Sequence, residues 1–377
     1  MRKSIVVIVG IVVLAVVLWL TATVELTSWD FRNNLWAPAH LLWRGESAYD
    51  ISGMFTSSNA VWFPPIIAVF SLLGLLPLQL GTNAWLGMSV VLLVALTWYL
   101  SLQAAQSRPK PLAFGLLVLA VFLFPPTIRH LLLGQADVVL IAAMIAGTHA
   151  LARNRLVLGA LLFAVALSKP QLCVIVLPSL VAWLVISQRG WRDATKFLVV
   201  TGGFALLLTV PLWLGSTQWL DDFWSNLNGN PQWSQPVLFS QLYIKAGRPG
   251  LVLWCLAFVA CLVLSIGLWC RLGPTRGVLW SMALTTVASL YLWSWDFVLL
   301  LPLLVDTVAR LTNTLSRVVL FAFWAACLVL TVLSIQVVGA GDSRLWWLPL
   351  VIITGIVLSL RLAQWPGKRA TAESTAS

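Results

Sequence analysis

Carboxylates are rare in this chain, and three of them lie close together after the first apolar run. Asp30, Glu46 and Asp50 account for three of the twelve Asp and Glu in 377 residues. A carboxylate at the boundary between hydrocarbon and water is partly desolvated, which makes it more basic. We interpret Asp30 as a general base that removes a proton from a hydroxyl group. The alternative is an acid that caps the short helix after it.

Asp50 and Glu46 are weaker candidates in the same loop. We include Asp50 as a substrate contact, whereas solvation or pairing with Arg44 is the alternative for both acids.

Cationic residues lie at two breaks between apolar runs. Lys169 precedes Pro170, and Arg129 and His130 follow a pair of prolines. A Lys at membrane depth is costly unless something compensates its charge. We predict that Lys169 and Arg129, with His130 beside them, hold a phosphate and stabilise the charge that grows on it as a leaving group. The alternatives are snorkelling of Lys169 and interface anchoring of Arg129.

The remaining polar candidates flank predicted helices. Gln135 adjoins the second cationic edge, and we expect it to contact substrate. Asp296 either caps the next helix or contacts the acceptor. Asp137 begins an apolar run, where an acid favours a helix N-terminus, so we interpret it as structural. Asp221 and Asp222 lack a third ligand, so we predict neither a metal nor another cofactor.

The composition predicts an all-α polytopic membrane protein. Apolar residues make up 60% of the chain and charged residues 9%, and the mean hydropathy is +0.95. Apolar runs of about 17 to 25 residues are long enough to cross a bilayer as helices. The net charge of +11 comes from Lys and Arg between these runs, which indicates positive-inside orientation rather than nucleic-acid binding. The sequence contains no nucleotide-binding motif.

We predict a bundle of about twelve membrane-spanning helices with both termini cytoplasmic. The expected spans lie near residues 5–26, 83–103, 112–128, 137–151, 157–168, 171–187, 197–215, 250–270, 277–293, 296–310, 317–336 and 345–362. The apolar run 61–80 stays on the outer side as a short re-entrant or interfacial helix, because prolines interrupt it and a full crossing would place later basic loops outside.

This topology places two long loops, 27–82 and 216–249, on the extracytoplasmic side, and the first carries interfacial helices. Residues 1–366 then form a single transmembrane domain, and residues 367–377 form a disordered cytoplasmic tail. Many of the 22 tryptophans fall near the outer interface. An aromatic belt explains them, although some could stack on a sugar ring.

The order of these motifs resembles the GT-C superfamily of integral-membrane glycosyltransferases. The similarity is greatest to glycosyltransferase family 87, the DUF2029-type mannosyltransferases. The residues that carry it are Asp30–Phe31, Leu42–Asp50, Trp62–Pro65, Leu133–Asp137, Ser168–Pro170 and Tyr291–Asp296.

The resemblance implies a GT-C-like bundle in the cell membrane with an extracytoplasmic active site. It also implies a polyprenyl-phosphate sugar donor, a glycolipid or glycan acceptor of the cell envelope, and inversion at the anomeric carbon. Its catalytic carboxylate maps onto Asp30. The family's GQxN pattern reads Gly134–Asp137 here, so an acid replaces an amide. Membrane lipids are expected partners, and nucleic acid is not.

A flippase or transporter of lipid-linked sugars is the alternative function. Transporters place charges at the midplane and carry repeat halves. Here the charges and the long loops fall on one face, which favours an enzyme.

Overall fold

The computed structural model describes residues 28–55, 59–105, 110–229, 235–338 and 342–364, and this part of the chain is helical without a strand. The all-α prediction is therefore confirmed for the described residues. The predicted first span, 5–26, and the predicted tail, 367–377, lie outside them.

Five helical stretches in the described residues are long and apolar enough to cross a membrane: Leu78–Ala105, Gly190–Gly215, Arg248–Leu272, Thr314–Leu333 and Ser343–Gln364. They correspond to α5 (Leu78–Ala105), α11 (Gly190–Leu207) with α12 (Val210–Gly215), α15 (Arg248–Leu272), α18 (Thr314–Val338), and η7 (Asp342–Leu345) with α19 (Leu348–Gln364). A sixth is possible if α6 (Pro111–Phe122) and α7 (Pro125–Leu133), which meet at 65°, form one span. Pro125 and Pro126 explain this bend, because proline cannot donate to the preceding turn.

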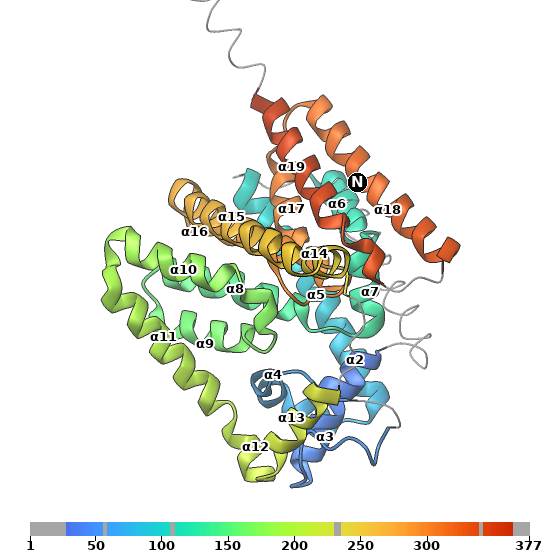
Figure 1. Cartoon of the computed structure of the whole chain (residues 1–377), viewed down its shortest axis with the longest axis vertical. Coiled ribbons are helices and arrows are strands. Elements are labelled where there is room, and N and C mark those ends of the chain that lie inside the picture. Colours follow the sequence, from blue (N-terminus) through green and yellow to red (C-terminus); the bar gives the residue numbers. More distant parts are fainter. Residues whose placement is uncertain (1–27, 56–58, 106–109, 230–234, 339–341, 365–377) are drawn as a thin grey trace, which may run out of the picture.

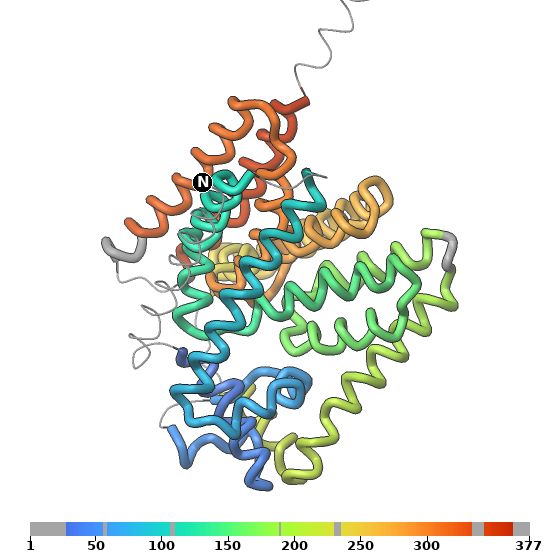
Figure 2. Tube along the Cα trace, turned by 180° about the vertical axis from the view of Figure 1, so that it is seen from behind, coloured from blue at the N-terminus to red at the C-terminus, as the bar shows by residue number. Residues whose placement is uncertain are grey.

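The other predicted spans are shorter helices or turns. They are α8 (Asp137–Ala152), α9 (Leu156–Ala166), η4 (Pro170–Cys173), α10 (Val176–Leu184), η5 (Val185–Arg189), α16 (Pro274–Ala288), η6 (Asp296–Leu300) and α17 (Leu301–Arg310). Helix α14 (Leu238–Ala246), which was not predicted as a span, precedes α15. In Figures 1 and 2, α8 to α11 form one group of helices beside α5, whereas α18 and α19 lie together at the opposite end of the molecule from the first loop.

The two predicted outer loops meet in one lobe. The first contributes α2 (Trp29–Phe31), η2 (Arg32–Trp36), α3 (Ala37–Trp43), α4 (Pro64–Val69) and η3 (Ser71–Leu75), and the second contributes α13 (Trp219–Gly229). The other helix of the second loop, α14, packs on α15 instead. Asn226 donates a 2.8 Å hydrogen bond to the Tyr49 carbonyl, and Phe223 lies 4.8 Å from the Tyr49 ring between centroids. Figure 1 shows both segments at the same end of the molecule. The apolar run expected as one short helix is divided into α4 and η3.

Large apolar side chains cover the outside of the long helices. Leu206 and Leu214 are 71% and 82% exposed, and Val263 on α15 is 64% exposed. A water-facing surface of this kind would aggregate. These helices therefore present the surface that lipid tails solvate, as expected for a membrane protein.

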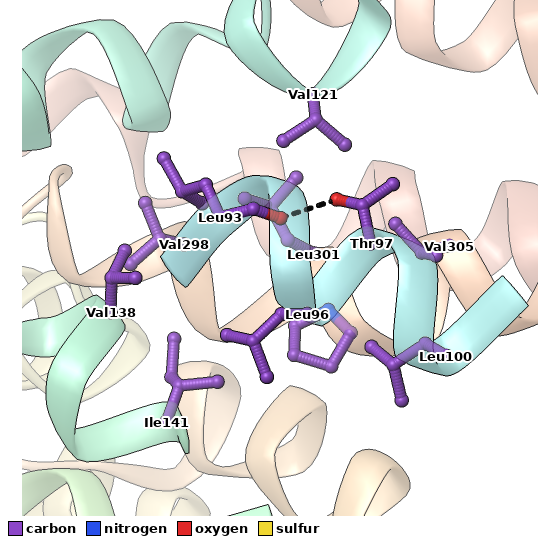
Figure 3. Close-up of a pocket in the computed structure, with 11 residues that line it drawn as sticks. Leu93, Leu96, Thr97, Leu100, Val121, Val138, Ile141, Val298, Leu301 and Val305 are labelled. Carbon is purple, nitrogen blue, oxygen red and sulfur yellow. Dashed lines mark hydrogen bonds between the residues drawn. The ribbon is translucent and has the colours of Figure 1, made fainter. Parts of the chain in front are cut away.

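The interior beside α5 is filled by aliphatic side chains. Figure 3 shows Leu93, Val138, Val298 and Leu301 around a cavity of about 20 Å³, with the Thr97 hydroxyl turned back to the Leu93 carbonyl at 2.7 Å. Such a cavity holds about one water molecule at most, and only when polar partners are available. The core beside α5 is therefore closely packed.

Candidate active site

Lys169 is the centre of a buried polar cluster. Its ammonium lies 2.6 Å from Gln135 Oε1, 2.6 Å from Asp137 Oδ1 and 3.1 Å from Asp296 Oδ1. The residue is 5% exposed. An ammonium group has three N–H donors and no acceptor, so these partners use its hydrogen-bonding capacity completely. Although burial lowers it, the carboxylates of Asp137 and Asp296 raise the pKa of Lys169 above its usual value.

A break in the chain brings Lys169 to this position. Helix α9 ends at Ala166, and Pro170 begins η4 because its fixed φ suits a first helical position. The Ser168 carbonyl accepts the Phe63 N–H at 3.2 Å, and the Trp62 ring centroid lies 5.4 Å from the Lys169 ammonium. The first loop thus covers the lysine with an aromatic face.

Gln135 connects the lysine to the candidate base. Its Oε1 accepts from Lys169, and its Nε2 donates to Asp30 Oδ2. Because Lys169 only donates, the amide oxygen must face the ammonium and the amide NH₂ must face Asp30. The chemistry of the two neighbours therefore determines how this side chain is oriented.

Asp30 is half-buried and has donors on both oxygens. Asn34 Nδ2 donates to Asp30 Oδ1 at 3.2 Å, and the Asn34 Oδ1 accepts the Val61 N–H at 2.7 Å. Burial raises the pKa of Asp30 to about 6, against the opposing influence of Lys169 and the Gln135 hydrogen bond, while the charge of Asp137 adds to the rise. A carboxyl group of this pKa is a stronger base than an exposed aspartate and is still ionised near neutral pH.

The helix that carries Asp30 is fastened to the end of α7. The Ser28 N–H donates to the Leu132 carbonyl at 2.6 Å. Gly134 has φ of 68°, and a Cβ there would lie 2.7 Å from Phe31 Cβ. Glycine is thus required both by its left-handed backbone and by the close approach of Phe31. The same turn fixes Asp30 and Gln135 relative to each other.

Two further acids complete the cluster. Asp137, the first residue of α8, is 0% exposed, and its Oδ2 lies 3.4 Å from His130 Nδ1. Asp296, 1% exposed, also accepts the Trp293 N–H at 2.7 Å. Two buried carboxylates therefore contact the ammonium directly, and the third, Asp30, is connected to it through Gln135. Repulsion between acids is strong in such a low-dielectric interior.

Aromatic residues border this cluster. The Arg129 guanidinium carbon lies 5.7 Å from the Trp295 ring centroid, and Trp293 stacks on Trp295 at 5.3 Å with an interplanar angle of 15°. Arg129 itself is half-buried. Asp50 is exposed and accepts a 2.6 Å hydrogen bond from Ser52 in its own loop, and within the described residues it makes no hydrogen bond or ion pair with the cluster. Glu46 pairs with Arg44 at 2.8 Å.

The structure brings most of the predicted site residues together: Asp30, Gln135, Lys169, Asp296 and, through Asp137, His130. Arg129 adjoins them and Asp50 does not contact them. Lys169 differs from the expectation in its partners, since carboxylates occupy the donors that a phosphate would need. Asp137 and Asn34 were not predicted as site residues. The sequence did contain a signal for Asp137, because this acid replaces the amide at the fourth position of the GQxN pattern.

No group of three His, Cys, Asp or Glu side chains in the described residues is arranged to hold a metal ion. The acids of the cluster are instead directed at the lysine and the amide.

Comparison with known families decides the assignment of the chain. The sequence model of glycosyltransferase family 87 matches residues 62–302. The chain belongs to glycosyltransferase family 87. No curated protein matches it in a sequence search.

Membership of family 87 indicates glycosyltransferase activity. The family 87 match includes Arg129, Gln135, Asp137, Lys169 and Asp296, and it begins after Asp30. The assignment of Asp30 as a site residue therefore rests on its hydrogen bond to Gln135, which the family match includes.

Replacement of Lys169 by Met should destabilise this family 87 protein strongly, because it leaves Asp137 and Asp296 buried without a counter-charge. Breaking a buried ion pair costs about 3–5 kcal/mol. We expect a large decrease in the thermal unfolding midpoint in detergent, and partial recovery in the double variant Lys169→Met/Asp137→Asn.

The matched control is Lys196→Met, which removes an exposed lysine 3.8 Å from Asp193. A surface pair of this kind contributes about 0–1 kcal/mol. Equal midpoint shifts for Lys169→Met and Lys196→Met would contradict the structural role of the buried pair.

Proposed function

We propose that this glycosyltransferase moves a sugar, most simply mannose, from a polyprenyl-phosphate donor to a lipid-linked or cell-envelope glycan acceptor. The reaction takes place on the extracytoplasmic face of the cell membrane and inverts the anomeric carbon. The chain crosses the membrane about twelve times with both termini cytoplasmic. The observation that carries the proposal is the half-buried Asp30 of the first long loop, which has a raised pKa and is connected through Gln135 to the buried cation Lys169.

Asp30 acts as the general base in this reaction. An acceptor hydroxyl transfers its proton to the Asp30 carboxylate while its oxygen forms a bond to C1 of the sugar. The C1–O bond to the phosphate breaks, and the polyprenyl phosphate leaves with the electron pair through an oxocarbenium-like transition state. Each carboxylate oxygen has two lone pairs, so the bonds from Asn34 and Gln135 leave an acceptor position for the hydroxyl.

Arg129 is the group that we assign to the departing phosphate. A guanidinium can bind two phosphate oxygens at once through parallel N–H donors. Its position over Trp295 supports the assignment, because that ring limits where the guanidinium can lie. His130, next to it, is directed at Asp137 instead.

Lys169 has a positioning role in this scheme. It holds Gln135 and Asp296 in place and supplies the positive charge that keeps Asp30 ionised. The stacked pair Trp293 and Trp295 offers an aromatic surface for a sugar ring beside Arg129.

Asp30→Asn should abolish most turnover, because an amide cannot accept the proton. General-base catalysis typically contributes about 10²–10⁴-fold, so we expect a loss of at least about 100-fold in kcat with radiolabelled polyprenyl-phosphate mannose and membranes. Glu46→Gln, which alters an exposed acid of the same loop, is the control and should retain activity. Native-like turnover by Asp30→Asn, at unchanged thermal stability, would exclude Asp30 as the base.

The pH profile should report the same carboxyl group. Only ionised Asp30 accepts a proton, so kcat/KM should decrease about tenfold per pH unit below its pKa of about 6 and level off above it. Because the Gln135 hydrogen bond stabilises the ionised form, Gln135→Met should move this limb to higher pH. An acid limb that stays in place in Gln135→Met would argue against this assignment.

Arg129→Gln should weaken donor binding. Hydrogen bonds to a charged group are worth about 1.5–3 kcal/mol, so the donor KM should rise by about 10- to 100-fold. Arg248→Gln, an exposed arginine at the start of α15, is the matched control. If both variants show the native KM for the donor, the phosphate is bound elsewhere.

A further inference from the structure

A second pocket lies away from the acid cluster, between α5, α8 and α9. Its volume is about 380 Å³, far larger than the 20 Å³ cavity of the core. Its lining on α8 runs from Ala142 to Ala150 and continues to Arg153, directly after the end of that helix, whereas Asp137 is the first residue of the helix. The arginine end of the pocket lies about 24 Å along the helix axis from Asp137. No residue of the acid cluster lines the pocket, so we treat it as a second site.

Small side chains create the space. Ala142, Ala146 and Ala150 follow one another at intervals of four on α8, and Ala95 lies opposite on α5. Residues four apart share one helix face, so α8 presents a strip without bulk to its neighbour. Leu92, Leu96 and Leu158 form apolar walls around it. The interior of the pocket is therefore suited to a hydrocarbon chain.

The mouth of the pocket is cationic. Arg153 and Arg155 line it, and both side chains are exposed. Asn154 between them has φ of 60°, a left-handed turn that Asn tolerates well. The chain reverses there. As a result Arg153, directly after α8, and Arg155, directly before α9, both line the same pocket.

Charge compensation is lacking at this mouth within the described chain. Neither Arg153 nor Arg155 forms a salt bridge with a carboxylate there, in contrast to Arg276 and Arg310, which both pair with Asp306. The polar pair beside them, Tyr99 Oη and His149 Nε2 at 2.7 Å, carries no negative group. The site thus combines an apolar interior with an excess of positive charge at the rim.

We propose that this pocket binds an anionic glycerophospholipid of the leaflet at this end of α8, with its phosphate on Arg153 and Arg155 and part of an acyl chain along the alanine strip. Basic residues at the membrane surface attract anionic lipids. The polyprenyl-phosphate donor does not fit this role, because a donor with its phosphate on Arg153 and Arg155 would hold its sugar at that end of α8, about 24 Å along the helix axis from Asp137.

The test uses the full-length protein, delipidated in a neutral detergent. Thermal unfolding is followed with added phosphatidylglycerol, phosphatidylcholine or inorganic phosphate, and bound lipid is measured by native mass spectrometry. Phosphatidylglycerol should raise the midpoint and remain bound, whereas neither of the other two should. Each arginine near an anionic lipid contributes about fivefold in affinity, so Arg153→Gln/Arg155→Gln should weaken phosphatidylglycerol binding by about 25-fold.

Two variants separate this site from general surface charge. Arg271→Gln removes an exposed arginine at the end of α15 and should bind phosphatidylglycerol as the native chain does. Ala146→Phe should fill the pocket and reduce lipid retention without altering the rim charge. The proposal is overturned if Arg271→Gln lowers binding as much as the Arg153/Arg155 double variant does. Equal stabilisation by phosphatidylcholine or by inorganic phosphate would overturn it as well. Because the readout is lipid binding, the result is independent of glycosyl transfer.

Discussion

Neutralisation of one buried ammonium organises this molecule. An isolated charge in a low-dielectric interior is so costly that it persists only with close partners. Lys169 has two carboxylates and an amide oxygen within 3.1 Å. Those partners begin α8, begin η6 and lie in the turn after α7. Elements that are distant in sequence are therefore held at one point by a single charge.

The first loop depends on this arrangement. Asp30 reaches the lysine through Gln135, and Asn34 ties the same carboxylate to the backbone of Val61. The Phe63 N–H then returns the loop to Ser168, beside the lysine. A loop rich in short helices thus acquires a fixed position from these polar contacts together with its buried apolar residues, such as Phe31, Tyr49 and Ile66, which belong to the apolar core. Pre-organisation of this kind is what general-base catalysis requires, because the base must be within hydrogen-bond reach of the proton.

The sequence predicted the class and the positions of most polar groups, because charge in an apolar chain is rare enough to identify. It did not predict the partners of Lys169, which come from positions 32 and 127 residues away and depend on tertiary packing. Asp137 was read as a helix-terminal acid, and it does begin α8. Its second role, as a hydrogen-bond and ion-pair partner of Lys169, depends on the turn after α9, which brings the two residues together in the folded chain. The break after the apolar run 157–168 did identify Lys169 as a functional candidate, but the sequence did not show that carboxylates rather than a phosphate would be its partners.

The neutral amide between cation and base has a chemical consequence. A lysine bonded directly to Asp30 would hold that carboxyl group strongly ionised and make it a poor base. Gln135 instead accepts from the ammonium and donates to the carboxylate, so Asp30 is oriented while burial still raises its pKa to about 6. Neither an acid nor an aliphatic residue at position 135 could do both, since the first has no donor when ionised and the second has no polar atom. The amide therefore lets one buried cation fix the geometry of the base without removing its basicity.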